Sequence, residues 1–474
     1  MVVKLDTTVY KEEGKRMKTK KIGFIAGILV ALIIHFLPLQ GIEPAGQTCL
    51  ALTLMTVVWW ATQVAQSGYV GGIYLILLIV LGVAEPELVF KSWTGSTMYL
   101  IIGAYLIASA VKDSGLGERI AYAFIIKFVR SYRGILISIF VLTFIMSILI
   151  PHPWPRAFLI MSVMAVVVKS AKMPKEDAVK VGFTVFAASV PVSLIFLTGD
   201  SIINPLAVAN SGVDLDWLGW FKVMGLPAIV ASVLTLLLIL VLFKPSKELE
   251  INLDEVKEKQ NSLGPLSTLE KRTAVWLVIA IVLWATDSIH GINIGWVTLG
   301  VAMFMSMPVI GEVLTAKSWG EVPVHVLIFL TSAMTIGTVG GATGMNEWLA
   351  KTILPSTIPN NPLVLAAFIA LIAMIIHMFM GSVIAVMGVA IPALMAFTSP
   401  MGINPLVTTL IVYTAVAIHY ILPFHHLNML VGQGEENGMY TQKETIRLGI
   451  PLTVVVFIVT VLVEIPWWKL LGML

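Results

Sequence analysis

Residues 56–63 read Thr-Val-Val-Trp-Trp-Ala-Thr-Gln and residues 280–287 read Ala-Ile-Val-Leu-Trp-Ala-Thr-Asp, so a Trp-Ala-Thr core occurs twice in the chain. Two further pairs follow in the same order: Lys91-Ser92-Trp93 with Lys317-Ser318-Trp319, and Ser114-Gly115-Leu116-Gly117-Glu118 with Thr343-Gly344-Met345-Asn346-Glu347. The spacing between copies grows slowly along the chain, as it does after a duplication followed by small insertions. The sequence therefore predicts two halves with one architecture.

The composition places both halves in a membrane. Of the 474 residues, 58% are hydrophobic and 12% are charged, and the mean hydropathy is +0.94. A soluble domain has roughly 45–50% apolar and roughly 25% charged residues. The apolar segments lack the regular alternation, about 10 residues per strand, of an outer-membrane barrel. We expect an all-α polytopic protein of the cytoplasmic membrane, surrounded by lipid, with about 11 transmembrane helices.

Charge and cysteine content exclude several other classes. Residues 1–21 hold seven basic and three acidic residues, whereas the rest of the chain is nearly neutral. With no basic face beyond this short tail, we expect no nucleic-acid partner. The single cysteine, Cys49, excludes an intrachain disulfide, and no Cys/His cluster indicates a structural metal. The chain has no phosphate-loop sequence, no HExxH and no nucleophile arrangement, so we expect that it is not an enzyme.

Apolar and polar segments predict the following organisation. The basic residues of the tail precede an apolar run that is too long for a secretory signal, so we expect a retained span with a cytoplasmic N-terminus. Two pairs of apolar segments joined at a Pro- or Gly-containing tip resemble re-entrant hairpins. The predicted parts are a cytoplasmic basic tail (1–21), a first helix with repeat 1 (22–243, with hairpin 134–170 and broken helix 180–210), a cytoplasmic linker (244–271), and repeat 2 (272–474, with hairpin 362–398 and broken helix 404–432).

The flanking charges indicate that the two repeats are inverted. The first hairpin is flanked by Lys127, Arg130, Arg133, Lys169, Lys172, Lys175 and Lys180, whereas the equivalent flanks of the second carry only Lys351. Positive charge marks the cytoplasmic side of a membrane, so we expect the two hairpins to enter from opposite faces and the C-terminus to lie outside. Inverted repeats with broken helices are typical of secondary transporters, whose site lies near the midplane.

The order of segments, the Trp-Ala-Thr region, residues 114–121 and the asparagine-ending breaks resemble the divalent anion/sodium symporter family of the ion-transporter superfamily. The resemblance covers almost the whole chain after the tail. It implies a homodimeric elevator with a scaffold and a mobile transport domain, moving dicarboxylates, citrate or sulfate, usually with sodium. The family's Ser-Asn-Thr tips are not intact. The first tip reads Pro151-His152-Pro153 and the second keeps only Ser382, while both broken-helix turns keep their asparagines.

The hairpin tips and the broken helices supply the candidate site. Helix N-termini aimed inward suit an anion and unwound carbonyls suit a cation. The candidate substrate-binding residues are His152, Pro153, Arg156, Gly381, Ser382, Val383, Asn204, His426 and Asn428, and the candidates for cation or proton coupling are Asp200, Ser201, Asn204, His425 and Asn428.

Several alternatives stay open at the level of sequence. Arg156 either contacts an anion or forms a structural pair, and Asp200 either binds a cation or proton or lies in an exposed loop. The driving ion is sodium or a proton, with protons or anion exchange slightly favoured because His152 replaces an oxygen ligand; no cofactor is implied apart from such a sodium ion. The predicted function is secondary active transport of a small di- or tricarboxylate or a sulfate-like anion by a homodimer. The alternative is a transport-inactive sensor or scaffold derived from a transporter.

Overall fold

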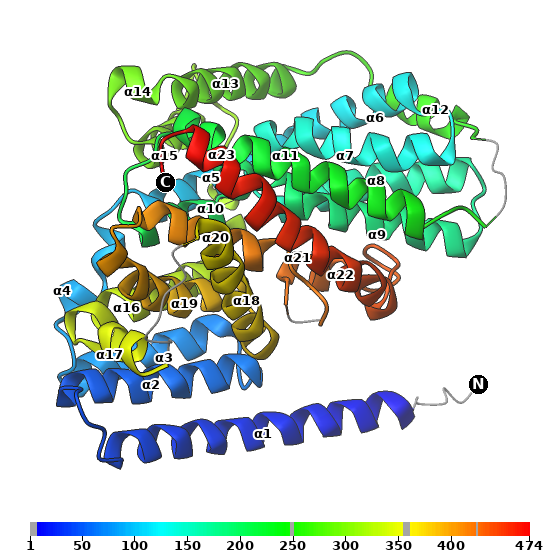
Figure 1. The fold of residues 1–474 in the computed structure, drawn as a ribbon. Helices are drawn as coiled ribbons and strands as arrows, with labels where there is room; N and C mark the ends of the chain where they lie inside the picture. Colours follow the sequence, from blue (N-terminus) through cyan, green and yellow to red (C-terminus); the bar gives the residue numbers. More distant parts are fainter. Residues whose placement is uncertain (1–6, 247–250, 354–360, 423–424) are drawn as a thin grey trace. The chain divides into compact units, whose positions relative to one another are not determined.

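The structure is a computed structural model that describes residues 7–246, 251–353, 361–422 and 425–474, and these residues are almost entirely helical (Figure 1). Seven of the described helices are long and apolar enough to cross a membrane: Met17–Phe36, Tyr132–Leu149, Trp217–Leu242, Val324–Ala342, Pro362–Met380, Val383–Met401 and Gln442–Leu470. An eighth candidate is a pair of helices bent by 65°. The expectation of an all-α polytopic membrane protein is therefore met, with seven or eight candidate spans.

The chain divides into two compact units, and each unit draws on both sequence halves. Unit 1 comprises Met1–Thr94, Pro323–Ile358 and Ile375–Gly402, and unit 2 comprises Gly95–Val322, Pro359–Met374 and Ile403–Leu474. The helix α18 (Pro362–Met380) contributes residues to both.

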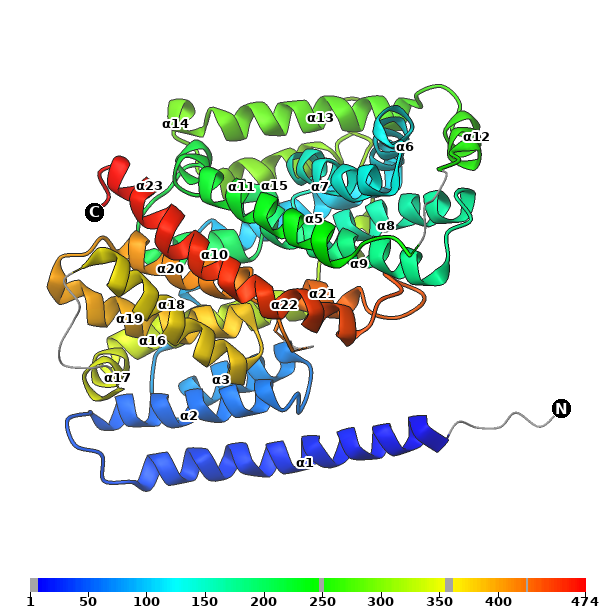
Figure 2. The same cartoon turned by 45° about the vertical axis from the view of Figure 1, so that its right-hand side comes forward.

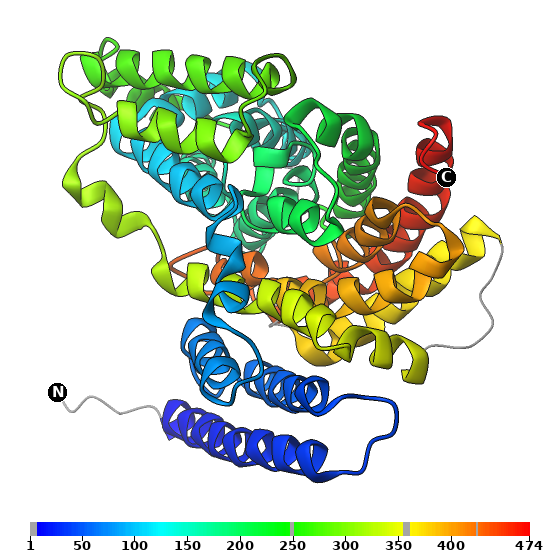
Figure 3. The same cartoon turned by 90° about the vertical axis from the view of Figure 1, so that its left-hand side faces the viewer.

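Unit 1 is built on two helix pairs, α1 with α2 (Figure 3) and α3 with α16. Phe24 stacks on the indole of Trp59, whose Nε1 donates to the Phe24 carbonyl at 3.0 Å. Gly71 lets α3 approach Ser332 of α16. The elements of unit 1, these four helices included, are α1 (Thr7–Phe36), α2 (Pro44–Ala61), α3 (Ser67–Val80), α4 (Pro86–Val89), η1 (Lys91–Trp93), α16 (Val324–Ala342), α17 (Met345–Ile353), α19 (Val383–Thr398) and η4 (Ser399–Met401).

Unit 2 contains most of the candidate site. Its elements are α5 (Thr97–Ser114), α6 (Leu116–Phe128), α7 (Tyr132–Leu149), α8 (Pro153–Ser170), α9 (Lys175–Val192), η2 (Leu197–Asp200), α10 (Ile203–Ser211), α11 (Trp217–Leu242), α12 (Asp254–Ser262), α13 (Thr268–Ala285), α14 (Asp287–His290), α15 (Ile294–Phe304), η3 (Ala316–Glu321), α20 (Pro405–Ala417), α21 (Leu427–Val431), α22 (Gln442–Phe457), η5 (Ile458–Glu464) and α23 (Ile465–Leu470). Helices α7, α8 and α9 pack side by side, and α11 lies along the continuous run of α22, η5 and α23 (Figure 2).

The duplicated motifs have the same local structure in both copies. Thr62 and Thr286 are the C-terminal caps of α2 and α13, and each hydroxyl donates to the carbonyl four residues earlier at 2.7 Å. Gly115 and Gly344 both have a positive φ, which favours glycine, and each ends one helix and precedes the next. At Gly115 this break produces the 65° bend between α5 and α6, in a segment that the sequence pattern alone presents as one apolar run.

The segment between the two sequence halves contains a short helix, α12. Helix α12 packs against α6 and α8, and its Val256 is fully buried. Ser267 and Glu270 form a capping box that begins α13. Arg119 of α6 donates to Glu270 at 2.5 Å and also to the carbonyls of Leu263 and Gly264. Most described side chains of this segment are exposed or half-buried, and the buried Leu253, Val256 and Glu270 hold it against the helices of unit 2.

Candidate functional site

The first hairpin tip lies between α7 and α8, and His152 is its N-terminal cap. His152 Nδ1 accepts a hydrogen bond from the backbone N–H of Trp154 at 3.2 Å, and Pro153 begins α8, where a missing N–H costs little. The other ring nitrogen lies 2.7 Å from the hydroxyl of Tyr105 on α5. Because Nδ1 accepts, the neutral ring carries its proton on Nε2 and donates it to Tyr105. Both nitrogens of His152 are therefore engaged within unit 2.

Arg156, one turn into α8, is completely buried. Its Nη1 donates to the carbonyls of Ile150 at 3.2 Å and Gly199 at 3.0 Å, and its Nη2 donates to Ser193 Oγ at 2.5 Å. No described carboxylate forms a salt bridge with it, but the buried carboxylate of Asp200 interacts with its charge at longer range. The hydrogen bonds of the guanidinium all go to neutral oxygens, and its Nε has no partner among the described residues.

The first broken helix is held by Asn204. Its Nδ2 donates to the carbonyls of Ser193 at 2.8 Å and Phe196 at 2.9 Å, and its Oδ1 accepts from the hydroxyl of Tyr413 on α20. These bonds satisfy carbonyls that the chain frees where α9 ends at Val192. Asn204 thus stabilises the break in the helix, and both polar atoms of its side chain form hydrogen bonds.

Asp200 and Ser201 complete the turn of the first broken helix. Asp200 is 6% exposed, and its Oδ1 accepts from the backbone N–H groups of Ile202 at 2.9 Å and Ile203 at 3.2 Å. The Ser201 backbone N–H donates to the Pro151 carbonyl of the hairpin tip at 3.2 Å, and its hydroxyl is buried without a partner in the described part of the chain. The tip and the broken helix of the first half therefore meet.

The second broken helix contributes Asn428 to the same region. Asn428 Nδ2 donates to the Phe186 carbonyl at 3.0 Å and to Ser189 Oγ at 2.5 Å, while its Oδ1 is buried and no described group donates to it. Ser189 and Ser193 both lie at the C-terminal end of α9. This end therefore joins Arg156 and Asn204 of the first half to Asn428 of the second.

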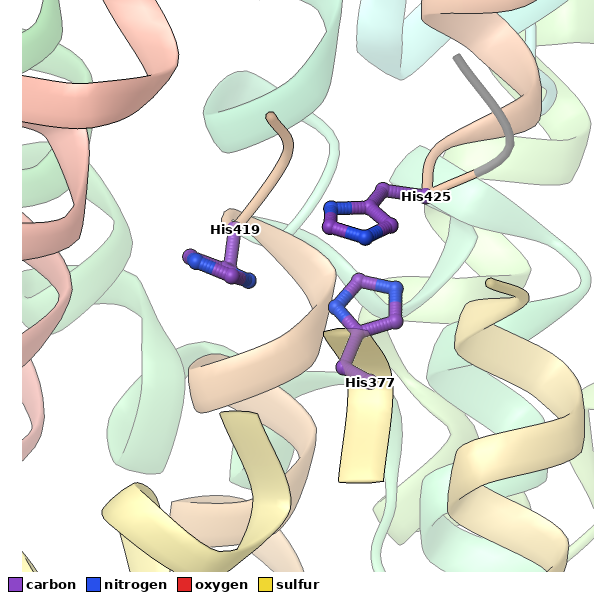
Figure 4. Close-up of side chains that lie close together, drawn as sticks. All are labelled: His377, His419 and His425. Atoms are coloured by element: carbon purple, nitrogen blue, oxygen red, sulfur yellow. The ribbon is translucent and has the colours of Figure 1, made fainter. Parts of the chain in front are cut away.

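His425 and His426 lie where the second helix is interrupted, between α20 and α21. His425 Nδ1 accepts from the backbone N–H groups of Ile421 at 3.1 Å and Leu422 at 3.3 Å, and its ring lies 5.7 Å from that of His419 (Figure 4). His426 precedes α21 and packs edge-on to Tyr420. Pro423 and Phe424 of this break lie outside the described residues.

The second hairpin tip belongs to unit 1. Gly381 has a positive φ, as a tight turn between α18 and α19 requires. Ser382 caps α19 by accepting from the Ala385 N–H at 3.4 Å, and Val383 begins the helix. The turn so formed resembles the first tip, where His152 is the capping residue.

Four residues that the sequence analysis did not select contact the candidates. They are Tyr105, Ser189, Ser193 and Tyr413. Their hydroxyls sit inside long apolar segments, where serine and threonine most often bond to their own helix. Ser189 and Ser193 could have been selected from the sequence, because they lie close to a predicted helix break. No comparable sequence signal marks Tyr105 or Tyr413.

The site combines a buried cation with unpaired oxygens. The free Nε of Arg156 can donate to a carboxylate or sulfate oxygen, and charge-assisted bonds of this kind are among the strongest in proteins. Ser201 Oγ and Asn428 Oδ1 are hard oxygen atoms of the type that sodium accepts as ligands. No covalent chemistry is apparent, because none of these groups is an activated nucleophile.

Comparison with known proteins gives the family. A family model described as the sodium:sulfate symporter transmembrane region matches residues 18–474. The chain is 25% identical to the putative malate transporter YflS of Bacillus subtilis, over 73% of this chain and 75% of that protein. It is 21% identical to the sodium-dependent dicarboxylate transporter SdcS of Staphylococcus saprophyticus (86% and 85% covered) and 22% identical to the L-tartrate/succinate antiporter of Escherichia coli (84% and 81% covered). The chain is therefore a multi-pass membrane protein that belongs to the sodium:sulfate symporter family, the divalent anion/sodium symporters identified from its sequence, and this is a family of transporters and not of enzymes.

Proposed function

We propose that the protein is a secondary active transporter of small anions, of the di- or tricarboxylate or sulfate type, in the cytoplasmic membrane. The observation that carries the proposal is the buried Arg156, which forms no salt bridge with a described carboxylate and whose Nε has no hydrogen-bond partner among the described residues. An anionic substrate at the hairpin tip would supply the missing partner. Relatives named for malate, dicarboxylates, tartrate and succinate support the same substrate class.

The proposed mechanism is an elevator of two inverted repeats, which places the N-terminus and the linker in the cytoplasm and the C-terminus outside. Matching helix caps at Thr62 and Thr286 and matching left-handed glycines at Gly115 and Gly344 support the repeat. The uneven distribution of lysine and arginine around the hairpins supports the inversion. A homodimer is proposed by analogy with the family.

Two ions remain candidates for coupling, beside anion exchange. Sodium is supported by Ser201 Oγ and Asn428 Oδ1, which are buried and lack donors among the described residues. Protons are supported by the acidic and imidazole groups at the breaks, Asp200, His425 and His426. We assign the anion to Arg156, the hairpin tips at His152–Pro153 and Gly381–Val383, Asn204, His426 and Asn428. We assign binding of the coupling ion to Asp200, Ser201, Asn204, His425 and Asn428.

The test is uptake and counter-exchange of radiolabelled succinate, malate, tartrate and sulfate in proteoliposomes, with sodium or potassium on both sides. The expected result is saturable exchange of at least one of these anions. A second candidate, a transport-inactive sensor, is favoured by the complete internal bonding of His152 and Asn204. Saturable binding of an anion in a thermal-shift assay, with neither uptake nor exchange, would select the sensor.

A further inference from the structure

A carboxylic acid is buried in the last candidate span of unit 2. Glu464 lies in the helical run Gln442–Leu470 and has an exposed fraction of 0%. The acidic residues within the seven candidate spans are Glu444 and Glu464. Glu444 belongs to the capping box at Thr441, at the start of the helix, where a carboxylate is expected. Glu464 has no such structural role.

The backbone around Glu464 departs from the α-helix. Residues Ile458–Glu464 form a π-helical segment, η5, between α22 and α23. Pro466 follows two residues later, and a proline inside a helix has no N–H to donate and crowds the carbonyl four residues earlier. Widening the preceding turns relieves this conflict. Such π-helical segments are rare and are found mostly at functional sites.

Only one oxygen of the Glu464 carboxyl is satisfied. Oε1 accepts from the Thr414 hydroxyl on α20 at 2.5 Å, and Oε2 is buried with no partner in the described part of the chain. An ionised carboxylate with one neutral donor and no cation is costly to bury, whereas the neutral acid is tolerated. The geometry therefore requires a proton on the carboxyl in this conformation.

The neighbouring elements supply no charge that would compensate an ionised Glu464. From α20, Tyr413 and Thr414 face this region, and both are neutral. On α11 and α23 the basic side chains of Lys222 and Lys469 are exposed. The titratable groups of α22, namely Lys443, Glu444 and Arg447, lie at least 17 residues away along the helix, which is about 25 Å at about 1.5 Å per residue. Among the described residues, none of these groups forms a salt bridge with Glu464.

Helix α20 connects Glu464 to the candidate substrate site. Thr414 binds Glu464, and the preceding residue, Tyr413, donates to Asn204 of the first broken helix. Asn204 in turn bonds to the Ser193 carbonyl, and the hydroxyl of Ser193 accepts from Arg156. Any displacement of α20 relative to the broken helix therefore acts on the environment of the carboxyl as well.

We propose that Glu464 is a proton-binding site coupled to transport: the carboxyl is protonated in the conformation seen here and releases its proton when movement at the broken helix alters the Thr414 contact. The O–H bond of the acid breaks, and the proton passes to water at the membrane surface that the conformation opens to. This inference rests on the proposed transport function and names its coupling ion. It adds a site outside the hairpin tips and broken-helix turns.

The test uses proteoliposomes at constant sodium, loaded with whichever of succinate, malate, tartrate or sulfate the wild type exchanges. With acid outside, one coupled proton changes the limiting accumulation ratio about tenfold per pH unit. We expect wild type to follow the gradient and Glu464→Gln to lose this response while keeping exchange at equal pH. Glu464→Asp should retain the gradient response at a reduced rate, and Thr414→Val, which keeps the acid, should retain coupling with a shifted pH profile.

A second readout does not depend on transport. Infrared difference spectra of purified protein, taken between neutral and alkaline pH, should contain the carbonyl stretch of a protonated carboxyl that Glu464→Gln lacks. Gradient-driven accumulation by Glu464→Gln at the wild-type level, or a protonated-carboxyl band that survives this substitution unchanged, would overturn the inference. Absence of both uptake and exchange in wild type would instead overturn the proposed function and with it the coupling, while the infrared band would still decide whether Glu464 holds a proton.

Discussion

Arg156 Nη2 donates to Ser193 Oγ across 37 residues of chain, at 2.5 Å. This bond ties the first hairpin helix to the end of α9, and the Ser193 hydroxyl itself bonds onward to the Ser189 carbonyl. Two nitrogens of Arg156, Nη1 and Nη2, hold the tip and the broken helix together, so it has a structural role. Its Nε has no partner among the described residues, and the proposed contact with an anion would use this nitrogen.

Arg156→Gln is expected to raise the apparent KM for the anion or to abolish uptake, because a hydrogen bond to a charged group is worth about 1.5–3 kcal/mol. Ser193→Ala removes the bond from Arg156 and the bond to the Ser189 carbonyl but keeps the charge, so it should lower thermal stability while changing KM less. Ser162→Ala, on the exposed face of α8, is the matched control. Initial rates over a range of substrate concentrations separate these effects. Unchanged KM and rate in Arg156→Gln would remove Arg156 from the anion site.

Tyr413→Phe should destabilise the protein by about 1–3 kcal/mol, because Asn204 Oδ1 would remain buried without its donor. Thermal unfolding in detergent measures the effect, and Tyr69→Phe, at an exposed position, is the control. An unchanged melting temperature for Tyr413→Phe would mean that a water molecule replaces the hydroxyl. The bond from Tyr413 to Asn204 would then not be needed to stabilise the break.

Gly449→Ala is expected to destabilise the packing of α22, because a Cβ there would overlap the backbone carbonyl of Tyr420. Overpacking of this kind costs about 1–3 kcal/mol. Gly300→Ala, on α15, meets nothing within 4 Å and should be neutral or slightly stabilising, since alanine favours a helix over glycine. The two melting temperatures give the comparison, and equal values would show that α22 can shift away from Tyr420 without cost.

Some features of the fold and of the candidate site could be predicted from the sequence, and others could not. The helix breaks next to Pro153 and at Gly381 could be predicted, because proline and glycine mark turns in a sequence. The bend at Gly115 is not among the predicted breaks, although the polar residues Lys112–Ser114 and Glu118–Arg119 on its two sides interrupt the apolar pattern. The partners of Arg156 and Asn204 are mostly backbone carbonyls, which every residue carries, so no side-chain pattern identifies them. Glu464 is a lone acid in an apolar run of the sequence, yet only its contacts distinguish an unpaired carboxyl from a paired one.

The Arg119–Glu270 contact predicts a dependence on pH outside the membrane. The Arg119 guanidinium lowers the pKa of Glu270 from its usual 4.5 to about 2. A lowered folded-state pKa means that the stabilisation is fully present above about pH 4.5 and is lost as the pH falls towards about 2. Hydrogen exchange of amides 263–270, corrected for intrinsic pH dependence, should show protection falling across this window.

Glu270→Gln is the control for this prediction. At pH 6 its protection should already be as low as that of acidified wild type, and it should not change further on acidification. Protection in wild type that persists to pH 2 would mean that the carbonyl contacts of Arg119 hold the segment without the carboxylate.

The proposed inversion of the repeats predicts which loops face the outside. After replacement of the buried Cys49 by alanine, a single cysteine at Lys169, beside the basic flank of the first hairpin, should resist an impermeant reagent in intact cells. A cysteine at the exposed Ser399, after the second hairpin, should be labelled. Loss of the exposed Lys169–Glu255 pair should cost little stability, since such pairs contribute about 0–1 kcal/mol. Labelling after permeabilisation controls for reactivity at both positions. Equal labelling of the two cysteines in intact cells would place both hairpins on one side, and the flanking charges would then have another cause than inversion.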